Sequence, residues 1–209
     1  MRIVLTFDDG PGPSTGALLD ALAARGVSAT FFVLGASIDR RRAIAVRAAR
    51  EGHALGNHTY SHDRTLADRE LADGSTHSPE LSDKLVDELA RTDALLDEVY
   101  VEAGRAPAGR YPVRLPYGVL PDDARVDVLH ALGRVHVGWT ADFADWLPTA
   151  DAADLARRMR AHVDDCAAHG VDAVLDLHDG SRRDEPREAT VAAVARLIDE
   201  LGPTAFAIR

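Results

Sequence analysis

The chain has 209 residues and a formal net charge of −10 at pH 7. Its length suits one domain with a sizeable core, and its acidity argues against a nucleic-acid partner, because phosphate binding requires a basic face. No run reaches the roughly 18 consecutive apolar residues of a membrane span, and a strand predicted from residue 2 leaves no room for a leader. The single cysteine, Cys166, cannot form an internal disulfide. We therefore expect a cytoplasmic protein, or an extracellular one if the chain has been trimmed.

Short β-branched or aromatic runs alternate with longer helical patterns along the chain. We expect strands at 2–7, 29–34, 54–57, 134–139, 173–178 and 204–208, and helices at 14–26, 37–52, 78–99, 121–133, 149–170 and 187–202. Such alternation predicts parallel strands wrapped by helices, in either a barrel or an open sheet. No linker divides the chain, so one α/β domain is expected over residues 1–209. The irregular segment 63–79 is expected to be a loop over one face.

The first predicted strand runs into a glycine-rich turn, GPGPSTG (10–16), which invites comparison with a phosphate cradle. A cradle needs backbone N–H donors, which Pro11 and Pro13 lack. Asp8 and Asp9 stand in front of the turn and would repel a phosphate, and the spacing misses GxGxxG by one residue. The two acids, at the carboxyl end of a strand where active sites gather in α/β folds, are therefore the better candidates for chemistry.

The segment GNHTYSH places His58 and His62 four residues apart. A single helical turn would put both imidazoles on one side, where two histidines can hold a divalent metal. One acid of the first strand would supply a third ligand and leave open positions on the ion. The alternative is that both histidines only cap and hydrogen-bond their loop. Apart from His178, which ends a predicted strand, the remaining histidines match no ligand spacing: His53, His77, His130, His136, His162 and His169.

Adjacent acids on a strand point to opposite sides, so Asp8 and Asp9 should divide their roles. One can bind a metal while its neighbour accepts a proton from an activated water. The alternative is that one acid merely caps the helix that begins near Ser14 and Thr15.

Five short motifs occur in a fixed order along the chain. They are TFDDGP (6–11), HTYSH (58–62), RLPYG (114–118), DFADW (142–146) and LDLHDG (175–180). Together they resemble the five motifs of NodB-type polysaccharide deacetylases, carbohydrate esterase family 4, over effectively the whole chain. The resemblance implies a distorted, TIM-like (β/α) barrel of about seven strands. It also implies a hydrolase that removes N-acetyl or similar acyl groups from sugars with a divalent metal, most often Zn²⁺ (zinc), with Co²⁺, Ni²⁺ or Fe²⁺ as options.

Carried over by position, the resemblance assigns the metal ligands and the general base. Asp9, His58 and His62 would hold the metal, and Asp8 would be the base. Arg114 would pair with Asp8 and keep it ionised.

The resemblance also assigns the residues that would act on the amide. Asp145 would hydrogen-bond His178 and keep it protonated, so that His178 donates to the leaving amine. Tyr117 would offer its backbone N–H to the oxyanion, and Trp146 would wall the acyl pocket. Taken singly, several of these residues have plainer interpretations: a surface ion pair for Arg114, a helix cap for Asp145 and a core side chain for Trp146.

Asp176 departs from the family pattern, in which a leucine usually stands two residues before the final histidine. Strand alternation puts Asp176 on the same face as His178, and a carboxylate in an apolar pocket is costly unless it is paired. The acyl pocket is therefore expected to be polar, suited to a formyl or hydroxylated acyl group, a cyclic amide or a substrate with an amine. Alternatively, Asp176 pairs with a neighbouring arginine and leaves substrate choice alone.

The resemblance implies an N-acylated sugar as the favoured substrate. A small sugar or an oligosaccharide is expected instead of a polymer, because few aromatic residues fall in predicted loops that could form a polymer groove. Hydrolysis of a non-sugar amide, formamide or cyclic imide by the same site is the nearest alternative. A two-histidine, one-carboxylate Fe(II) oxygenase and a metal-loaded carbohydrate-binding module without turnover are more distant ones. The sequence does not predict an oligomeric state.

Overall fold

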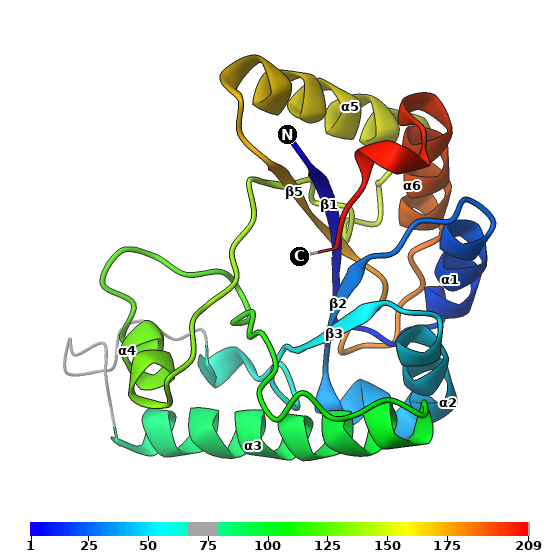
Figure 1. The fold of residues 1–209 in the computed structure, drawn as a ribbon. Coiled ribbons are helices and arrows are strands. Elements are labelled where there is room, and N and C mark those ends of the chain that lie inside the picture. Colours follow the sequence, from blue (N-terminus) through cyan, green and yellow to red (C-terminus); the bar gives the residue numbers. More distant parts are fainter. Residues whose placement is uncertain (67–78, 209) are drawn as a thin grey trace.

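The computed structural model describes residues 1–66 and 79–208 as an α/β domain (Figure 1). Its strands are β1 (Ile3–Asp8), β2 (Thr30–Val33), β3 (Ala54–Asn57), β4 (Ala141–Asp142) and β5 (Ala173–His178). Its α-helices are α1 (Thr15–Ala23), α2 (Gly35–Arg50), α3 (Pro79–Glu102), α4 (Ala124–Ala131), α5 (Ala152–His169) and α6 (Glu188–Leu201), with short 3₁₀ helices at Arg64–Leu66 and Pro203–Ala205. Most of the segment expected as a loop at 63–79, including His77, lies outside the described residues. No helix in the described ranges is long and apolar enough to cross a lipid bilayer.

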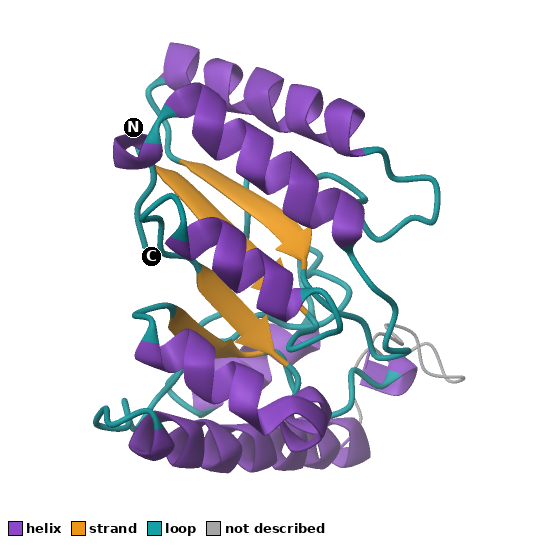
Figure 2. Cartoon of the chain, turned by 90° about the vertical axis from the view of Figure 1, so that its right-hand side faces the viewer, coloured by secondary structure: helices purple, strands orange, loops and turns teal. Residues whose placement is uncertain are grey.

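The strands form one parallel sheet in the order β3-β2-β1-β5-β4. Around it, α5, α6, α1, α2 and α3 follow one another in an arc, and each helix contacts the next (Figures 1 and 2). This is the strand-and-helix alternation that the sequence pattern predicts. It places the first strand at the centre of the sheet, between the second strand and the last.

Two isolated parallel bridges continue the sheet beyond β3. Asn57 pairs with Val113, and Val113 pairs with His136. The described residues form five strands, extended by these two bridged positions, and not the roughly seven strands that the resemblance implied. The chain nevertheless has the expected single-domain, barrel-like α/β fold.

Two of the predicted strands were wrong. At 134–139 only the His136 bridge forms, because the carbonyl groups of Val137 and Gly138 accept hydrogen bonds from the Arg114 guanidinium and are not available to a neighbouring strand. At 204–208 a 3₁₀ turn leaves a single bridge from Phe206 to Ile3.

Strand alternation gives β1 and β5 one apolar face and one polar face. On the outer face, Leu5 and Phe7 pack into the core that the helices cover. On the inner face, the parallel register pairs Thr6 with Asp176 and Asp8 with His178. Because carboxyl ends of parallel strands open at the same edge of the sheet, this polar inner face leads directly to the candidate site.

Candidate metal centre and active site

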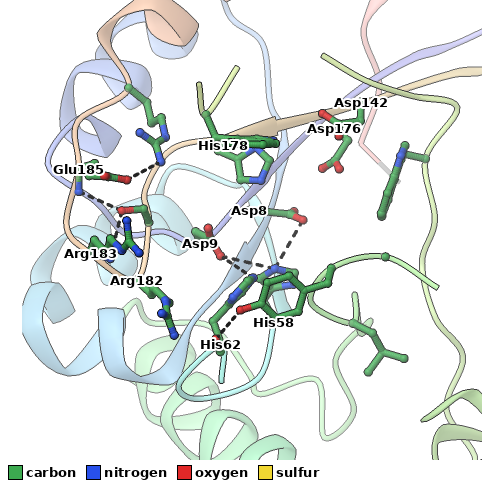
Figure 3. A pocket seen from close by; sticks show the side chains of 17 residues that line it. Asp8, Asp9, His58, His62, Asp142, Asp176, His178, Arg182, Arg183 and Glu185 are labelled. Carbon is green, nitrogen blue, oxygen red and sulfur yellow. Dashed lines mark hydrogen bonds and ion pairs between the residues drawn. The ribbon is translucent and has the colours of Figure 1, made fainter. Parts of the chain in front are cut away.

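Three side chains converge at the carboxyl end of the sheet (Figure 3). Asp9 follows β1, whereas His58 and His62 lie in the loop that leaves β3. The Oδ1 atom of Asp9 is 3.6 Å from Nε2 of His58 and 3.4 Å from Nε2 of His62. Their ligand atoms all lie within 4.8 Å of one another, and they are the one such cluster of potential metal ligands in residues 1–66 and 79–208.

The chemistry of this cluster fits a divalent cation. Asp9 Oδ1 is buried without a hydrogen-bond partner, which is costly for a carboxylate oxygen unless a cation satisfies it. The Nδ1 atom of His58 lies 2.8 Å from the carbonyl oxygen of Arg114, so Nδ1 donates and Nε2 keeps a free lone pair. Burial lowers the pKa of His58 and of His62, which keeps both imidazoles neutral, as metal ligands must be.

The loop that presents the two histidines is not the predicted helical turn. Thr59 and His62 have left-handed φ values of 70° and 53°, and the chain from 58 to 63 is irregular. Glu88, buried on α3, fixes this loop by accepting hydrogen bonds from the backbone N–H groups of Tyr60 and Ser61 and from the Ser61 hydroxyl.

Sequence reasoning missed Glu88. It stands three residues after buried Leu85, on the stripe of α3 that faces the core. A charged residue at a core position of an otherwise apolar stripe is the signal that would have found it.

Arg114 lies at the bottom of the site, with 0% of its surface exposed. Its Nη1 atom lies 2.9 Å from Asp8 Oδ1, 2.8 Å from Asp176 Oδ1 and 2.8 Å from Thr6 Oγ1. Phe32 and Trp139 flank the guanidinium. The two carboxyl groups therefore share one buried cation. The structure thus contains the pairing of Asp176 with an arginine that the sequence analysis gave as an alternative.

The balance of burial and charge sets the pKa of both acids. Burial raises the pKa of Asp8 to about 6, although the Arg114 charge opposes the shift. Burial and the neighbouring charge of Asp8 raise the pKa of Asp176 to about 8. Arg114 therefore offsets only part of the desolvation of Asp8.

His178 ends β5 and is held by Asp145. The Nδ1 atom of His178 is 2.8 Å from Asp145 Oδ1, and its backbone N–H donates to Asp145 Oδ2 at 2.9 Å. Thr190 also donates to Asp145 Oδ2, at 2.6 Å. Burial alone would lower the pKa of His178, but the hydrogen bond and charge of Asp145, with the charges of Asp9 and Asp8, raise it to about 10.

A cavity of about 490 Å³ opens over these groups. Eight of the ten residues predicted for the site line it: Asp8, Asp9, His58, His62, Tyr117, Trp146, Asp176 and His178. Arg114 and Asp145 do not line the cavity, but they form hydrogen bonds with residues that do. Tyr117 and Trp146 stand at the mouth, with 42% and 45% exposure.

Tyr117 packs its ring against His62, with ring centroids 4.4 Å apart, and donates its hydroxyl to the His62 carbonyl oxygen. Trp139 and Arg182 also line the cavity but were not predicted. Trp139 fell within a segment predicted as a strand, and the loop after β5 carried no motif.

The glycines of the first turn serve close packing. A Cβ atom on Gly10 would lie 2.1 Å from Asp179 Oδ2, and one on Gly12 would lie 2.5 Å from the Gly180 Cα atom. The turn after β1 is thus pressed against the turn after β5, which brings Asp9 close to His178. This arrangement is consistent with the prediction that Asp8 and Asp9 carry the chemistry and that the glycines only shape the turn.

The fold is a parallel, barrel-like α/β fold. Its site places two histidines and an aspartate beside a second buried carboxylate and a charged histidine. This is the arrangement of a metal-dependent hydrolase. Residues 1–137 match the family model described as polysaccharide deacetylase. The chain belongs to the polysaccharide deacetylase family, whose members hydrolyse amide C–N bonds.

Relatives of known activity cover the chain to different extents. A chitooligosaccharide deacetylase of Sinorhizobium fredii is 34% identical over 99% of this chain and 88% of its own length. A peptidoglycan-N-acetylglucosamine deacetylase of Bacillus cereus is 33% identical over 69% of this chain, which corresponds to 46% of that protein. The likeness to the first relative therefore includes the last third of the chain, with His178.

Solved structures show the same fold. The peptidoglycan deacetylase PdaC of Bacillus subtilis aligns with a TM-score of 0.70 at 26% identity, covering 99% of this chain and 86% of that one. A family 4 carbohydrate esterase of Streptomyces lividans, in complex with acetate, aligns with a TM-score of 0.71 at 25% identity, covering 99% and 91%.

Proposed function

We propose that this protein hydrolyses an N-acyl amide on a sugar or oligosaccharide. The observation that carries this proposal is the convergence of Asp9, His58 and His62 beside the buried carboxylate of Asp8, whose Oδ2 lies 3.7 Å from His58 Nε2. Its similarity to a chitooligosaccharide deacetylase over nearly its whole length supports an N-acetylated oligosaccharide as the substrate.

We assign the divalent cation to Asp9, His58 and His62, and propose zinc, which two imidazoles and one carboxylate suit well. Such a cation supplies Lewis acidity, which acidifies water and polarises an acyl carbonyl. Asp8 then acts as the general base. Its Oδ1 is held by Arg114, which leaves Oδ2 to accept a proton from the attacking water.

His178 is the general acid in this proposal. Because its Nδ1 is bound to Asp145, its Nε2–H is the group that can donate to the departing nitrogen. The raised pKa keeps this imidazole protonated at neutral pH. The backbone N–H of Tyr117 is assigned to the oxyanion, and Trp146 to one wall of the cavity.

The direct test is a release assay with matched metals. The protein loaded with Zn²⁺, Co²⁺, Ni²⁺ or Fe²⁺, and the metal-free protein, are incubated with N-acetylated chitooligosaccharides and with small non-sugar amides. Mass spectrometry then detects the freed acid and amine. We expect the zinc form to deacylate the sugars and an Asp8→Asn variant to bind metal without turnover. If the metal-loaded protein releases acid only from the non-sugar amides, the substrate is a non-sugar amide and not a sugar. If it releases acid from neither the sugars nor the amides, the proposal is overturned.

A further inference from the structure

Asp176 is a buried acid whose second oxygen meets the substrate cavity. Its exposure is 4%, and Oδ1 is fixed by Arg114 at 2.8 Å. Its Oδ2 makes no hydrogen bond and is not among the fully buried unpartnered atoms of the described residues, and the side chain lines the cavity (Figure 3). One oxygen is thus anchored, and the other faces the cavity without a hydrogen-bond partner.

The position of Asp176 along β5 shows which part of a substrate it meets. It precedes His178 by two residues on the same face, which places it roughly 6–7 Å further from the strand end. Tyr117 and Trp146 stand at the open mouth. His178 serves the leaving nitrogen, so the bulky amine part extends toward the mouth. The small acyl group lies toward the deeper wall, where Asp176 is.

This wall carries two carboxyl groups. Asp142 pairs with Asp176 in the register of β4 and β5 and lines the same cavity. Arg114, the cation nearest to Asp176, already serves Asp8 and Thr6. An acyl methyl group here would strip water from the carboxyl group and give no hydrogen bond in return. A hydroxyl group can accept from the protonated acid, whose pKa is about 8, or donate to its ionised form.

We propose that Asp176 is a specificity-determining residue that makes this enzyme prefer acyl groups bearing a hydroxyl group, such as a hydroxyacyl (glycolyl) group, over acetyl. This inference rests on the proposed function and adds the acyl class. The reaction is otherwise unchanged: water adds across the C–N bond, and a hydroxy acid and an amine leave. A satisfied hydrogen bond to a buried group discriminates by about tenfold or more.

The test uses two chitooligosaccharides that differ only in the acyl group, N-glycolyl or N-acetyl. The kcat/KM for release of each acid is measured for the zinc-loaded wild type, Asp176→Leu, Asp176→Asn and Asp172→Asn. Asp172 is a matched control, because it precedes the same strand but lies at the surface against Arg2. We expect the wild type and the control to favour glycolyl by about tenfold or more, and Asp176→Leu to abolish or invert that preference.

Equal or greater acetyl release by the wild type, or an unchanged ratio in a folded Asp176→Leu, would overturn the proposal. If that variant does not fold, Asp176→Asn decides, and its ratio must fall at least about threefold. Calorimetric binding of the two uncleaved sugars to the metal-free protein gives an independent measure of the preference. If the wild type releases neither acid, the proposed function fails, and the binding comparison alone then decides the role of Asp176.

Discussion

The imidazole of His178 and the carboxylate of Asp145 form a two-point contact, since Asp145 accepts both from the ring and from the backbone N–H of the same residue. This contact fixes the orientation of the ring about the strand end and stabilises its charged form. Thr190, on α6, also donates to the Oδ2 atom of this carboxylate. The position of the proposed acid is therefore set by three separate segments of the chain.

Asp145→Asn should impair the function of His178 as the general acid without removing the imidazole. An amide oxygen can still accept a hydrogen bond, but it no longer stabilises the imidazolium, so the pKa of His178 should fall. We expect kcat to drop by about 10–100-fold and the alkaline limb of the pH profile to move to lower pH. Steady-state kinetics between about pH 5 and pH 10.5 would show both effects. The same change at exposed Asp154 is the control, and an unshifted alkaline limb would contradict the assigned role.

The pH dependence of kcat/KM should be bell-shaped with a broad plateau. Asp8 must be ionised to act as a base, so activity rises with pH through its pKa of about 6, or lower where a bound cation stabilises the carboxylate. His178 must be protonated, so activity falls through its pKa of about 10. Rates measured at saturating metal across this range test the assignment. A profile that keeps rising beyond about pH 10.5 would show that no acid of this kind is needed.

Removal of a proposed ligand should abolish tight metal binding. Asp9→Ala and His62→Ala each delete one of three ligands, and we expect both variants to purify with far less metal than the wild type. Added zinc should raise the melting temperature of the wild type but not of the variants, because ligand binding stabilises the native state. Elemental analysis and thermal unfolding are the measurements. His169→Ala, at the exposed end of α5, should behave as the wild type.

Glu88→Gln should reduce metal affinity although Glu88 touches no ligand. The amide keeps one acceptor oxygen but loses the charge that holds the backbone N–H groups of Tyr60 and Ser61. We expect about a 10–100-fold loss of zinc affinity by competition with a chelating dye. Glu98→Gln is the matched control, since Glu98 is exposed on the same helix and pairs with Arg42 at the surface. Equal affinities for the two variants would contradict a positioning role.

Asp176 should make the metal-free protein less stable as the pH rises. Its pKa is about 8 in the folded state, whereas an aspartate in an unstructured chain has a pKa near 3.8, so the folded chain holds a proton that the unfolded chain releases. The stabilisation is complete below pH 3.8 and is lost progressively up to about pH 8. Asp176→Asn lacks this dependence. The free energy of unfolding, measured with urea at about pH 5 and about pH 8, tests this. Relative to the wild type, the variant should be more stable at the higher pH by on the order of a few kcal/mol.

Much of the fold and of the metal cluster follows from local pattern in the sequence. The apolar run before Asp8 and the alternation of Asp176 and His178 are both features of strands, and parallel strands bring their ends together. The α-helices also lie within a few residues of their predicted ranges, because helical periodicity marks their extent and, in α4 and α5, a capping aspartate marks the start. In α5, Asp151 caps the first turn and Gly170, in the left-handed region, ends the last.

The errors arise where contacts distant in sequence replace local preference. The segment around Val137 has strand-like composition, yet Arg114 takes its carbonyl group. The two-residue strand β4 is too short to leave a pattern. The spacing of His58 and His62 indicates a helical turn, but their convergence depends on left-handed residues and on Glu88. The local sequence marks Glu88 as a charged residue at a core position, but it does not show which loop Glu88 holds.

The central position of β1 has a consequence for how the protein is made. β1 is synthesised before the other strands, but its neighbour β5 lies about 170 residues later, so one edge of the central strand waits unpaired until β5 has been made. The three proposed ligands of the cation lie within residues 9–62, whereas the acid arrives with the last strand. A chain arrested midway on the ribosome would thus carry ligands for a cation but no means to complete hydrolysis.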